Sequence, residues 1–249
     1  MSEKGKLAQA GIGSAKYFEQ AVKAELSVEV HRLSSVMSNP PDDALPCVRS
    51  VIAQAYETRD EGITFHARFT APKREEVDDG RLVMTLADGA PAELEFAADA
   101  STAFPRLLYS LLGTYAGAEV VHKTKKIGPV VKDIFEAEMI ASIVASQEAG
   151  YARLFLRAMG EKIDAPTRII TDSLSGARVI NNVQSAGRSR PFLWRSAVIQ
   201  DMCAKGEIRV LHVPDADNPA DFLTKWVSTV KVRASTRYAS GACHARGGE

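Results

Sequence analysis

The segment TRIITDSLSGARVI, residues 167–180, contains the features that decide the fold. TRIIT is short and apolar at its centre, which is typical of a strand buried inside a sheet. Asp172 ends this strand, and the residues after it, SLSGARVINNV, have the spacing of an amphipathic helix. A buried strand that leads directly into a helix indicates an α/β domain, in which helices cover a largely parallel or mixed sheet.

The sequence before this segment predicts three strands and a long helix. The strands are AELEFAADA (92–100), RLLYSLLG (106–113) and AEVVHKT (118–124), and TYAG (114–117) predicts a hairpin between the last two. FEAEMIASIVASQEAGYARLFLRAMG (135–160) has the pattern of an amphipathic helix, with a break expected near Gly150.

The sequence after it predicts further helices and one more strand. SAGRSRP (185–191) is expected to be a loop, FLWRSAVIQDMCAKG (192–206) a helix, and EIRVLHV (207–213) a strand. NPADFLTKWVSTV (218–230) predicts a last helix, with Asn218 as its cap and Pro219 at its first position. The expected fold is therefore a mixed sheet of five strands with helices on both faces.

The N-terminal part predicts a smaller region of helices and strands. Helices are expected at 17–37 and 44–56, separated by SNPPDD, and strands at GITFHARF (62–69) and RLVMTLA (81–87). APKREEVDDG between the two strands is expected to be a charged loop, and ADGAP (87–91) a turn. We expect residues 1–90 to form a separate connecting region, 91–230 an α/β domain, and 231–249 a disordered tail.

Composition excludes several classes of protein. The 249 residues include 31 Lys and Arg and 31 Asp and Glu, a balance that argues weakly against a protein that coats nucleic acid and leaves room for a local basic patch. No apolar run is long enough to span a bilayer, so no membrane partner is expected. The first residues, MSEKGKLAQAGIGSAK, lack an apolar signal core, which favours an intracellular location. The three cysteines are widely spaced and form no CxxC motif, so neither a disulfide framework nor a zinc site is indicated.

Four carboxylates lie at strand ends or helix starts, where sites gather in α/β sheets: Asp99, Glu138, Asp172 and Asp221. Each of them alone is more often a helix cap or a solvated charge. Asp172 could cap the following helix, although Ser173 could do so instead. Small residues beside Glu138 leave its carboxylate uncrowded, whereas Glu136 is expected at the surface.

The loop before Asp221 offers a contrast, because Asp215 and Asp217 are expected to be ordinary solvated acids. If the four carboxylates meet, their like charges repel unless cations neutralise them. Sites made only of carboxylates suit Mg²⁺ or Mn²⁺, which prefer oxygen ligands. Two such ions about 3.5–4 Å apart form an arrangement that cleaves phosphodiesters.

Several motifs resemble the ribonuclease H domain of Copia-type (Pseudoviridae) LTR-retrotransposon Pol polyproteins. FEAEMIA (135–141) resembles the T-E-A-E-Y-x-A helix of that family, and ADASTA (98–103) its S-D-A-x-x-A strand. IITDSLSGARVI (169–180) is similar to the strand that ends D-N-x-S-A, and 206–225 to the final segment with N-x-A-D-x-L-T-K. LSSVMSNPPDDALPCVRSVIAQAYETRDEGITF (33–65) is similar to the segment that links the reverse transcriptase to the ribonuclease H.

The resemblance implies a ribonuclease H-like fold that hydrolyses the RNA strand of an RNA–DNA hybrid with two Mg²⁺ (or Mn²⁺) ions. The metal-binding acids of the family carry over to Asp99, Glu138, Asp172 and Asp221. Partners would be the hybrid and the reverse transcriptase domain of the same polyprotein, in a cytoplasmic particle or the nucleus. The polymerase motif Y-x-D-D is absent, so reverse transcription is not expected of this chain.

Substrate contacts are expected from basic and polar residues near the acids. HKTKK (122–126), which resembles the family's W-x-S-K-K-Q, supplies Lys123, Lys125 and Lys126 as phosphate contacts, although a solvated charge run is an equal alternative. Arg190 is expected to add a contact, although Arg-Pro-Phe-Leu here departs from the family's R-x-K-H-I-D. Ser173 and Asn218 are candidates for contact with the ribose 2′-hydroxyl.

Two other functions remain open from the sequence. One is an inactive or host-retained ribonuclease H fold that binds nucleic acid or protein, which the zero net charge and the missing polymerase favour and the four acids disfavour. The other is a different nuclease or an integrase of the same fold, although that group does not share NPADFLTK.

Overall fold

A computed structural model describes residues 2–41, 43–63, 65, 72–76, 82–86, 94–102, 107–128, 131–181 and 190–241. For residues 72–76, 82–86 and 190–195 it describes the backbone only. Most of the expected strand GITFHARF, the turn ADGAP and most of the loop SAGRSRP lie outside the described residues.

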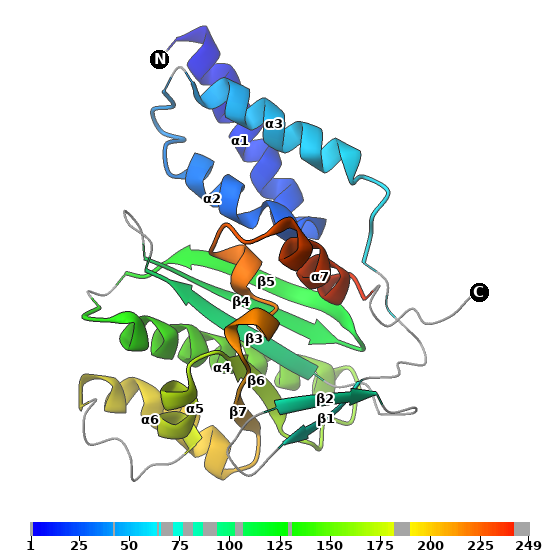
Figure 1. Cartoon of the computed structure of the whole chain (residues 1–249), viewed down its shortest axis with the longest axis vertical. Helices are drawn as coiled ribbons and strands as arrows, with labels where there is room; N and C mark the ends of the chain where they lie inside the picture. The colour runs from blue at the N-terminus through cyan, green and yellow to red at the C-terminus, as the bar shows by residue number, and fades with distance from the viewer. Residues whose placement is uncertain are drawn as a thin grey trace.

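Five of the described strands form one mixed sheet in the order β5-β4-β3-β6-β7 (Figure 1). The strands are β3 (Leu94–Ser101), β4 (Leu108–Tyr115), β5 (Ala118–Lys126), β6 (Thr167–Thr171) and β7 (Ile208–His212). β3, β4 and β5 pair antiparallel, whereas β3 with β6 and β6 with β7 pair parallel. Each of the five expected strands is present, and the predicted mixed sheet is confirmed.

The β4–β5 hairpin turns at Ala116 and Gly117, as TYAG predicted. Both residues have a positive φ, 51° and 77°, which is the requirement of a two-residue turn between twisted strands. Gly113 in β4 has a separate reason to be glycine, because a Cβ there would lie 2.6 Å from the ring of Phe96 and 2.8 Å from Val121. This absence of a side chain lets the Phe96 ring lie across β4 inside the core.

One face of the sheet is covered by three of the described helices, namely α4 (Ile134–Ala158), α5 (Leu174–Asn181) and α6 (Arg190–Ala204). The core on this side joins Phe96, Leu111 and Ile169 of the sheet to Met139 and Ile180 of the helices, all fully buried. The long helix continues through Gly150, so the expected break there is wrong. Gly150 is tolerated because its backbone remains within the hydrogen-bonded ladder of α4.

The opposite face is covered by the chain after β7, which differs from the expected final helix. Instead of a helix from Asn218, two 3₁₀ turns occur, η3 (Asp215–Asp217) and η4 (Asp221–Leu223), and the helix α7 begins later (Thr229–Ala239). Ser228 caps α7 by accepting the Lys231 N–H at 3.3 Å. The expected disordered tail is therefore wrong for residues 231–241, since α7 buries Ser235 and Ala239, while 242–249 lie outside the described residues.

Helices on both faces of the sheet, as the resemblance implied, are thereby confirmed. Ala97, Leu112 and Leu211 of the sheet pack against Phe222 and Leu223 of the 3₁₀ segment in a second core. Figure 1 shows this segment and α7 lying over the face of the sheet that is opposite to α4. No helix in the described part of the chain is both long and apolar enough to cross a membrane.

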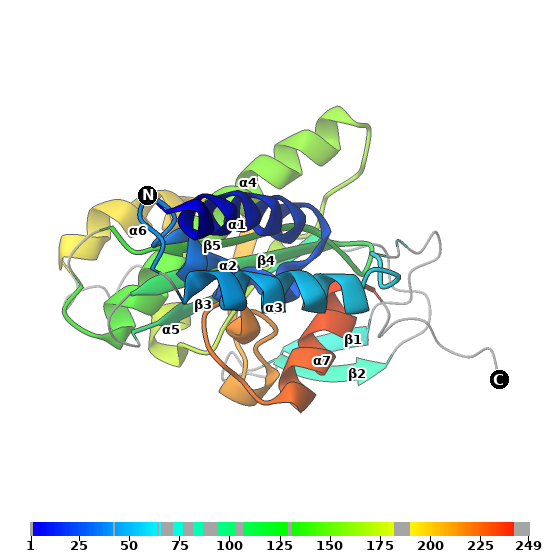
Figure 2. The same cartoon turned by 90° about the horizontal axis from the view of Figure 1, so that it is seen from above.

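The N-terminal region forms a helical layer beside the β5 edge (Figures 1 and 2). Its elements are α1 (Glu3–Val22), η1 (Ala24–Leu26), α2 (Ser27–Ser34) and α3 (Ala44–Glu57). The prediction of one helix at 17–37 is wrong, because the helix ends before Lys23. The buried ammonium of Lys23 donates to the carbonyl oxygens of Thr58 and Glu61. The helix expected at 44–56 is confirmed by α3.

A small antiparallel sheet joins β1 (Pro72–Glu76) to β2 (Leu82–Leu86). The strand expected at 81–87 is confirmed by β2. The charged loop expected at 71–80 is partly wrong, because PKREE is a strand whose backbone pairs with β2. The charged composition of PKREE disfavours a strand, and pairing with the apolar β2 overrides that propensity.

Candidate metal centre

Two of the four predicted acids lie at the same edge of the sheet because their strands are parallel neighbours. The β3–β6 register pairs Ala97 with Ile170, so Asp99 and Asp172 follow at corresponding places toward the carboxyl ends of the two strands. Asp99 is fully buried within β3, and Asp172 comes directly after β6 and is half-buried. This edge is where sites gather in open α/β sheets.

Glu138 reaches the same place from α4, and the start of that helix explains why it does. The Asp133 carboxylate accepts the Glu136 N–H at 2.9 Å, and Glu136 Oε2 accepts the Lys132 N–H at 2.7 Å. This reciprocal capping occupies Glu136, as expected of the acid that does not face the sheet. Glu138, two residues on, faces β3, and its Oε1 accepts the Ala100 N–H at 3.3 Å.

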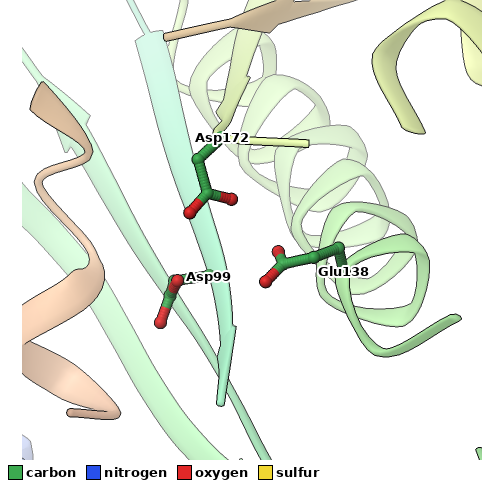
Figure 3. Close-up of side chains that lie close together, drawn as sticks. All are labelled: Asp99, Glu138 and Asp172. Carbon is green, nitrogen blue, oxygen red and sulfur yellow. The ribbon is translucent and has the colours of Figure 1, made fainter. Parts of the chain in front are cut away.

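The three carboxylates meet in one space between β3, β6 and α4 (Figure 3). Asp99, Glu138 and Asp172 each offer an oxygen, and these oxygens lie within 4.8 Å of one another. Glu138 is only 6% exposed, and its Oε2 has no hydrogen-bond partner in the described structure. A buried carboxylate oxygen without a partner is costly unless a cation or a water molecule completes its environment.

Asp221, the fourth predicted acid, joins the group from the loop after β7. It is 1% exposed and lies in the 3₁₀ turn η4, so the structure brings it inward as expected, although not from a helix. Its carboxylate shares a second set of oxygens within 4.8 Å of one another with Asp172 and Asp215. The Asp215 side chain is 72% exposed, as expected of a solvated acid. Its membership of this set of oxygens was not expected.

Two lysines that the sequence reasoning missed lie among the acids. Lys225 Nζ is 2.9 Å from Asp99 Oδ1, 3.3 Å from Asp221 Oδ1 and 3.6 Å from Asp215 Oδ1. Lys231 of α7 pairs with Asp221, and its Nζ donates to the Asp215 carbonyl oxygen at 2.5 Å. The position of Lys225 four residues after Asp221 was a usable signal, but the contact of Lys231 depends on where α7 folds.

Three acids of this site, Asp99, Glu138 and Asp172, have pKa values above those of ordinary carboxyls. Burial, together with nearby Asp221 and against the opposing charge of Lys225, raises the pKa of Asp99 to about 8. Burial and the charges of Asp172 and Asp99 raise the pKa of Glu138 to about 9, and burial also raises the pKa of Asp172. Burial would lower the pKa of Lys225, but the charge and hydrogen bond of Asp99 raise it above its ordinary value. The site thus brings five carboxyl groups together with two lysines.

These residues fit a divalent metal. The donor set consists of carboxylate oxygens, which Mg²⁺ and Mn²⁺ prefer, and Glu138 Oε2 is already free of other bonds. Asp99, Glu138 and Asp172 could hold one ion, and Asp172 and Asp221, with Asp215, a second. Asp172 belongs to both sets of oxygens.

The expected substrate contacts divide into those that face solvent and those that do not. Lys125 and Lys126 are exposed at the end of β5, whereas Lys123 pairs with Glu148 of α4 at 2.5 Å. His122, from the same basic run, is not available to phosphate because it lies between Glu119 and Glu19. The side chain of Arg190 lies outside the described residues.

The two expected contacts to a 2′-hydroxyl have other bonds. Ser173 Oγ accepts the Gly176 N–H at 3.2 Å at the start of α5, so Ser173 serves as the cap that was the alternative to Asp172. Asn218 is 1% exposed, and both ends of its amide bond main-chain groups, which leaves it no access to a substrate. This arrangement does not support its expected contact to the 2′-hydroxyl, which stays a prediction.

Comparison with known proteins supports the resemblance to Pol polyproteins. The chain is 25% identical over 227 residues, 91% of its length, to the retrovirus-related Pol polyprotein from transposon RE2 of Arabidopsis thaliana. It spans 14% of the length of that relative. The predicted resemblance to a retrotransposon Pol polyprotein is thereby confirmed. No family model matches the chain.

Solved structures with some likeness to the chain include ribonucleases H. The RNase H1 of the halophilic archaeon Halobacterium salinarum aligns over 53% of this chain and 93% of its own, with 19% identity and a TM-score of 0.40. The protease-reverse transcriptase of prototype foamy virus aligns over 86% of this chain and 29% of its own, with 16% identity and a TM-score of 0.37.

Proposed function

We propose that this chain is the ribonuclease H part of a retrotransposon Pol polyprotein, and that it hydrolyses the RNA strand of RNA–DNA hybrids. Asp99, Glu138, Asp172 and Asp221 are the proposed ligands of two divalent ions. The observation that carries the proposal is the buried Glu138 Oε2, which has no hydrogen-bond partner in the described structure. It lies in a cluster that contains more carboxyl groups than lysines. The sequence similarity to a Pol polyprotein supports the same reaction class.

The residues of the chain have separate parts in this reaction. When bound, the two ions would supply an activated water and stabilise negative charge at the phosphate. Asp99 and Glu138 are held rigidly by β3 and α4, so they place their oxygens with little freedom to adjust. The exposed Lys125 and Lys126 are the proposed contacts to the hybrid backbone, whose charge dominates the affinity of such complexes.

A labelled RNA–DNA hybrid incubated with the purified chain and Mg²⁺ tests the proposal. We expect endonucleolytic products from the RNA strand of the hybrid, and none from the same RNA as a single strand or from duplex DNA. Asp172→Asn keeps the shape of the side chain and removes its charge, so it should abolish the products. Absence of cleavage by the chain, or equal cleavage by the variant, would contradict the proposal.

A second candidate is a fold that has lost catalysis and binds nucleic acid or protein. The lysines favour it, because Lys225 and Lys231 already neutralise Asp99 and Asp221 and could replace a metal permanently. Calorimetric titration with Mn²⁺ separates the two functions. The nuclease requires saturable binding that Asp172→Asn weakens, whereas the binding module takes up no metal at this place.

A further inference from the structure

Asn218 connects the chain segments that carry two of the proposed ligands. Its Nδ2 donates to the Ala98 carbonyl oxygen at 2.9 Å, and its Oδ1 accepts the Ala220 N–H at 3.1 Å. Ala98 is the residue before Asp99, and Ala220 is the residue before Asp221. One side chain therefore bonds to the residue before each aspartate, although these aspartates are far apart in the sequence.

We propose that Asn218 is a positioning residue that sets the separation of Asp99 and Asp221. The inference rests on the proposed function, since it concerns two ligands of the same metal centre. Asn218 touches neither carboxylate, so it acts through the backbone from which each aspartate leaves. A metal centre needs its ligand atoms placed to within a few tenths of an ångström of their ideal positions. A fixed distance between the two backbone segments contributes to this accuracy.

The surroundings of Asn218 make this distance rigid. Ala98 and Ala220 are both fully buried, and Asn218 is 1% exposed, so water does not compete for these bonds. The bond from Oδ1 to a main-chain N–H two residues on is an Asx turn, which shapes the loop locally. The bond from Nδ2 to Ala98 is different, because it crosses to β3 and fixes that loop against the strand of Asp99.

Thr224 and Lys225 each bond to both aspartates directly, whereas two further bonds hold the same loop without linking them. Ser110 Oγ donates to the Ala220 carbonyl oxygen at 3.2 Å, and Thr124 Oγ1 donates to that of Leu223 at 3.1 Å. These bonds attach the loop to β4 and β5, so the loop has anchors that remain when Asn218 is replaced. A variant at Asn218 is therefore expected to fold, with its effect concentrated in the placement of Asp221 relative to Asp99.

A second asparagine offers a matched control. Asn181, at the end of α5, donates from Nδ2 to the Val210 carbonyl oxygen at 2.5 Å and accepts the Val210 N–H at 3.2 Å. It thus makes the same two kinds of main-chain bond as Asn218 but joins a helix end to β7 rather than two ligand segments. Asn181→Ala and Asn218→Ala should both lower the melting temperature, since each removes a pair of such bonds.

Calorimetric titration with Mn²⁺ distinguishes positioning from stability. We expect Asn218→Ala to weaken Mn²⁺ binding about tenfold or more, as loss of an outer-shell partner does. Asn181→Ala should stay within about twofold of the unmodified chain. Asn218→Ser retains an oxygen for the Asx turn but is too short to reach Ala98, so it tests the bond to β3 alone. The Mn²⁺ affinity of Asn218→Ser should lie between those of the unmodified chain and Asn218→Ala.

Hydrolysis of the hybrid gives an independent readout. Asn218→Ala should lower kcat and leave KM for the hybrid within about threefold, since the residue is buried away from the substrate. The inference is overturned if Asn218→Ala binds Mn²⁺ as the unmodified chain does, if both alanine variants weaken binding equally, or if Asn218→Ser behaves like the unmodified chain. If the unmodified chain itself binds no Mn²⁺, the proposed metal centre is wrong and the inference is overturned with it.

Discussion

Two clusters of polar side chains in this molecule differ in how their charge is balanced. The first, the interface cluster, consists of Glu19, Ser27, Glu119 and His122, where α1 and α2 meet β5. The second, the carboxylate cluster, consists of Asp99, Glu138, Asp172, Asp215 and Asp221. In the interface cluster His122 lies between two glutamates, and Ser27 also donates to Glu19.

The protonation of the two clusters shows what this difference means. Burial would lower the pKa of His122, but hydrogen bonds to Glu119 and Glu19 raise it to about 10, so the imidazolium persists at neutral pH. In the carboxylate cluster the pKa values of Asp99 and Glu138 are raised instead, because burial and like charges outweigh the nearby lysine. In the first cluster His122 is the partner of both glutamates, whereas the second cluster brings five carboxyl groups together with two lysines. This excess of carboxyl groups supports the proposed metal centre.

The largest expected effect comes from removing one charge of the carboxylate cluster. Asp99→Asn keeps the side-chain shape, but it removes the charge that pairs with Lys225 and a proposed metal ligand. We expect the rate of hybrid hydrolysis to fall on the order of 10³-fold, more than loss of an outer-shell partner costs. Steady-state cleavage rates measure this effect, and circular dichroism should show an unchanged fold. A variant that retains most of its activity would contradict the assignment.

Removing the cation of the interface cluster should affect stability and not metal binding. His122→Leu leaves Glu19 and Glu119 buried without their cation, which costs about 3 kcal/mol of unfolding free energy. Urea unfolding measures the loss. The Mn²⁺ affinity of the folded variant serves as the control, and a parallel loss of that affinity would show that the two clusters are coupled, contrary to the comparison.

Neutralising Glu138 should stabilise the metal-free protein at alkaline pH. The folded chain holds a proton on Glu138 up to about pH 9, whereas the ordinary value is 4.5, so stability falls as the pH rises between these values. Glu138→Gln removes this dependence and should raise the unfolding free energy at pH 8 by roughly 1–2 kcal/mol. At pH 4 the variant and the unmodified chain should be nearly equal. Thermal unfolding without metal at both pH values measures the difference, and a destabilised variant at pH 8 would contradict it.

The smallest expected effect concerns the lysine that α7 contributes. Lys231→Gln removes a cation that competes with a metal for Asp221, so Mn²⁺ affinity should increase by roughly threefold to tenfold. Lys205→Gln is the control, because Lys205 pairs with Asp201 on the surface of α6. Weaker binding by Lys231→Gln, or an equal change in both variants, would show that Lys231 does not compete with the metal.

Sequence patterns predicted most of the α/β domain correctly, because each of these patterns depends on residues that are close together in the sequence. The apolar run of TRIIT, the turn at Ala116 and Gly117, and the amphipathic spacing of α4 each depend on neighbours in sequence. The same reasoning failed at NPADFLTKWVSTV, where helical signals were present but the chain forms 3₁₀ turns. There bonds to distant strands hold the loop in place of helical bonds. Asn218 donates to Ala98 of β3, and Ser110 of β4 and Thr124 of β5 donate to carbonyl oxygens of the loop.

The N-terminal region shows the same limit. Val22, Leu26, Val30 and Leu33 have the spacing of one helix, yet Lys23 ends α1 because its ammonium reaches carbonyl groups after α3. PKREE was expected to be a loop for its charge, and its pairing with β2 makes it a strand. That residues 1–90 form a connecting region stays a prediction.

The sequence by itself indicated the order of the five strands and of helices α4, α5 and α6, and it singled out the four acids Asp99, Glu138, Asp172 and Asp221. It did so because periodicity and motif spacing are local properties of the chain. Only the tertiary structure decided that Asp215 and Lys231 join these acids, and that Asn218 bonds to Ala98 of β3. Their roles depend on contacts between segments far apart in the chain, and no local pattern encodes such distances.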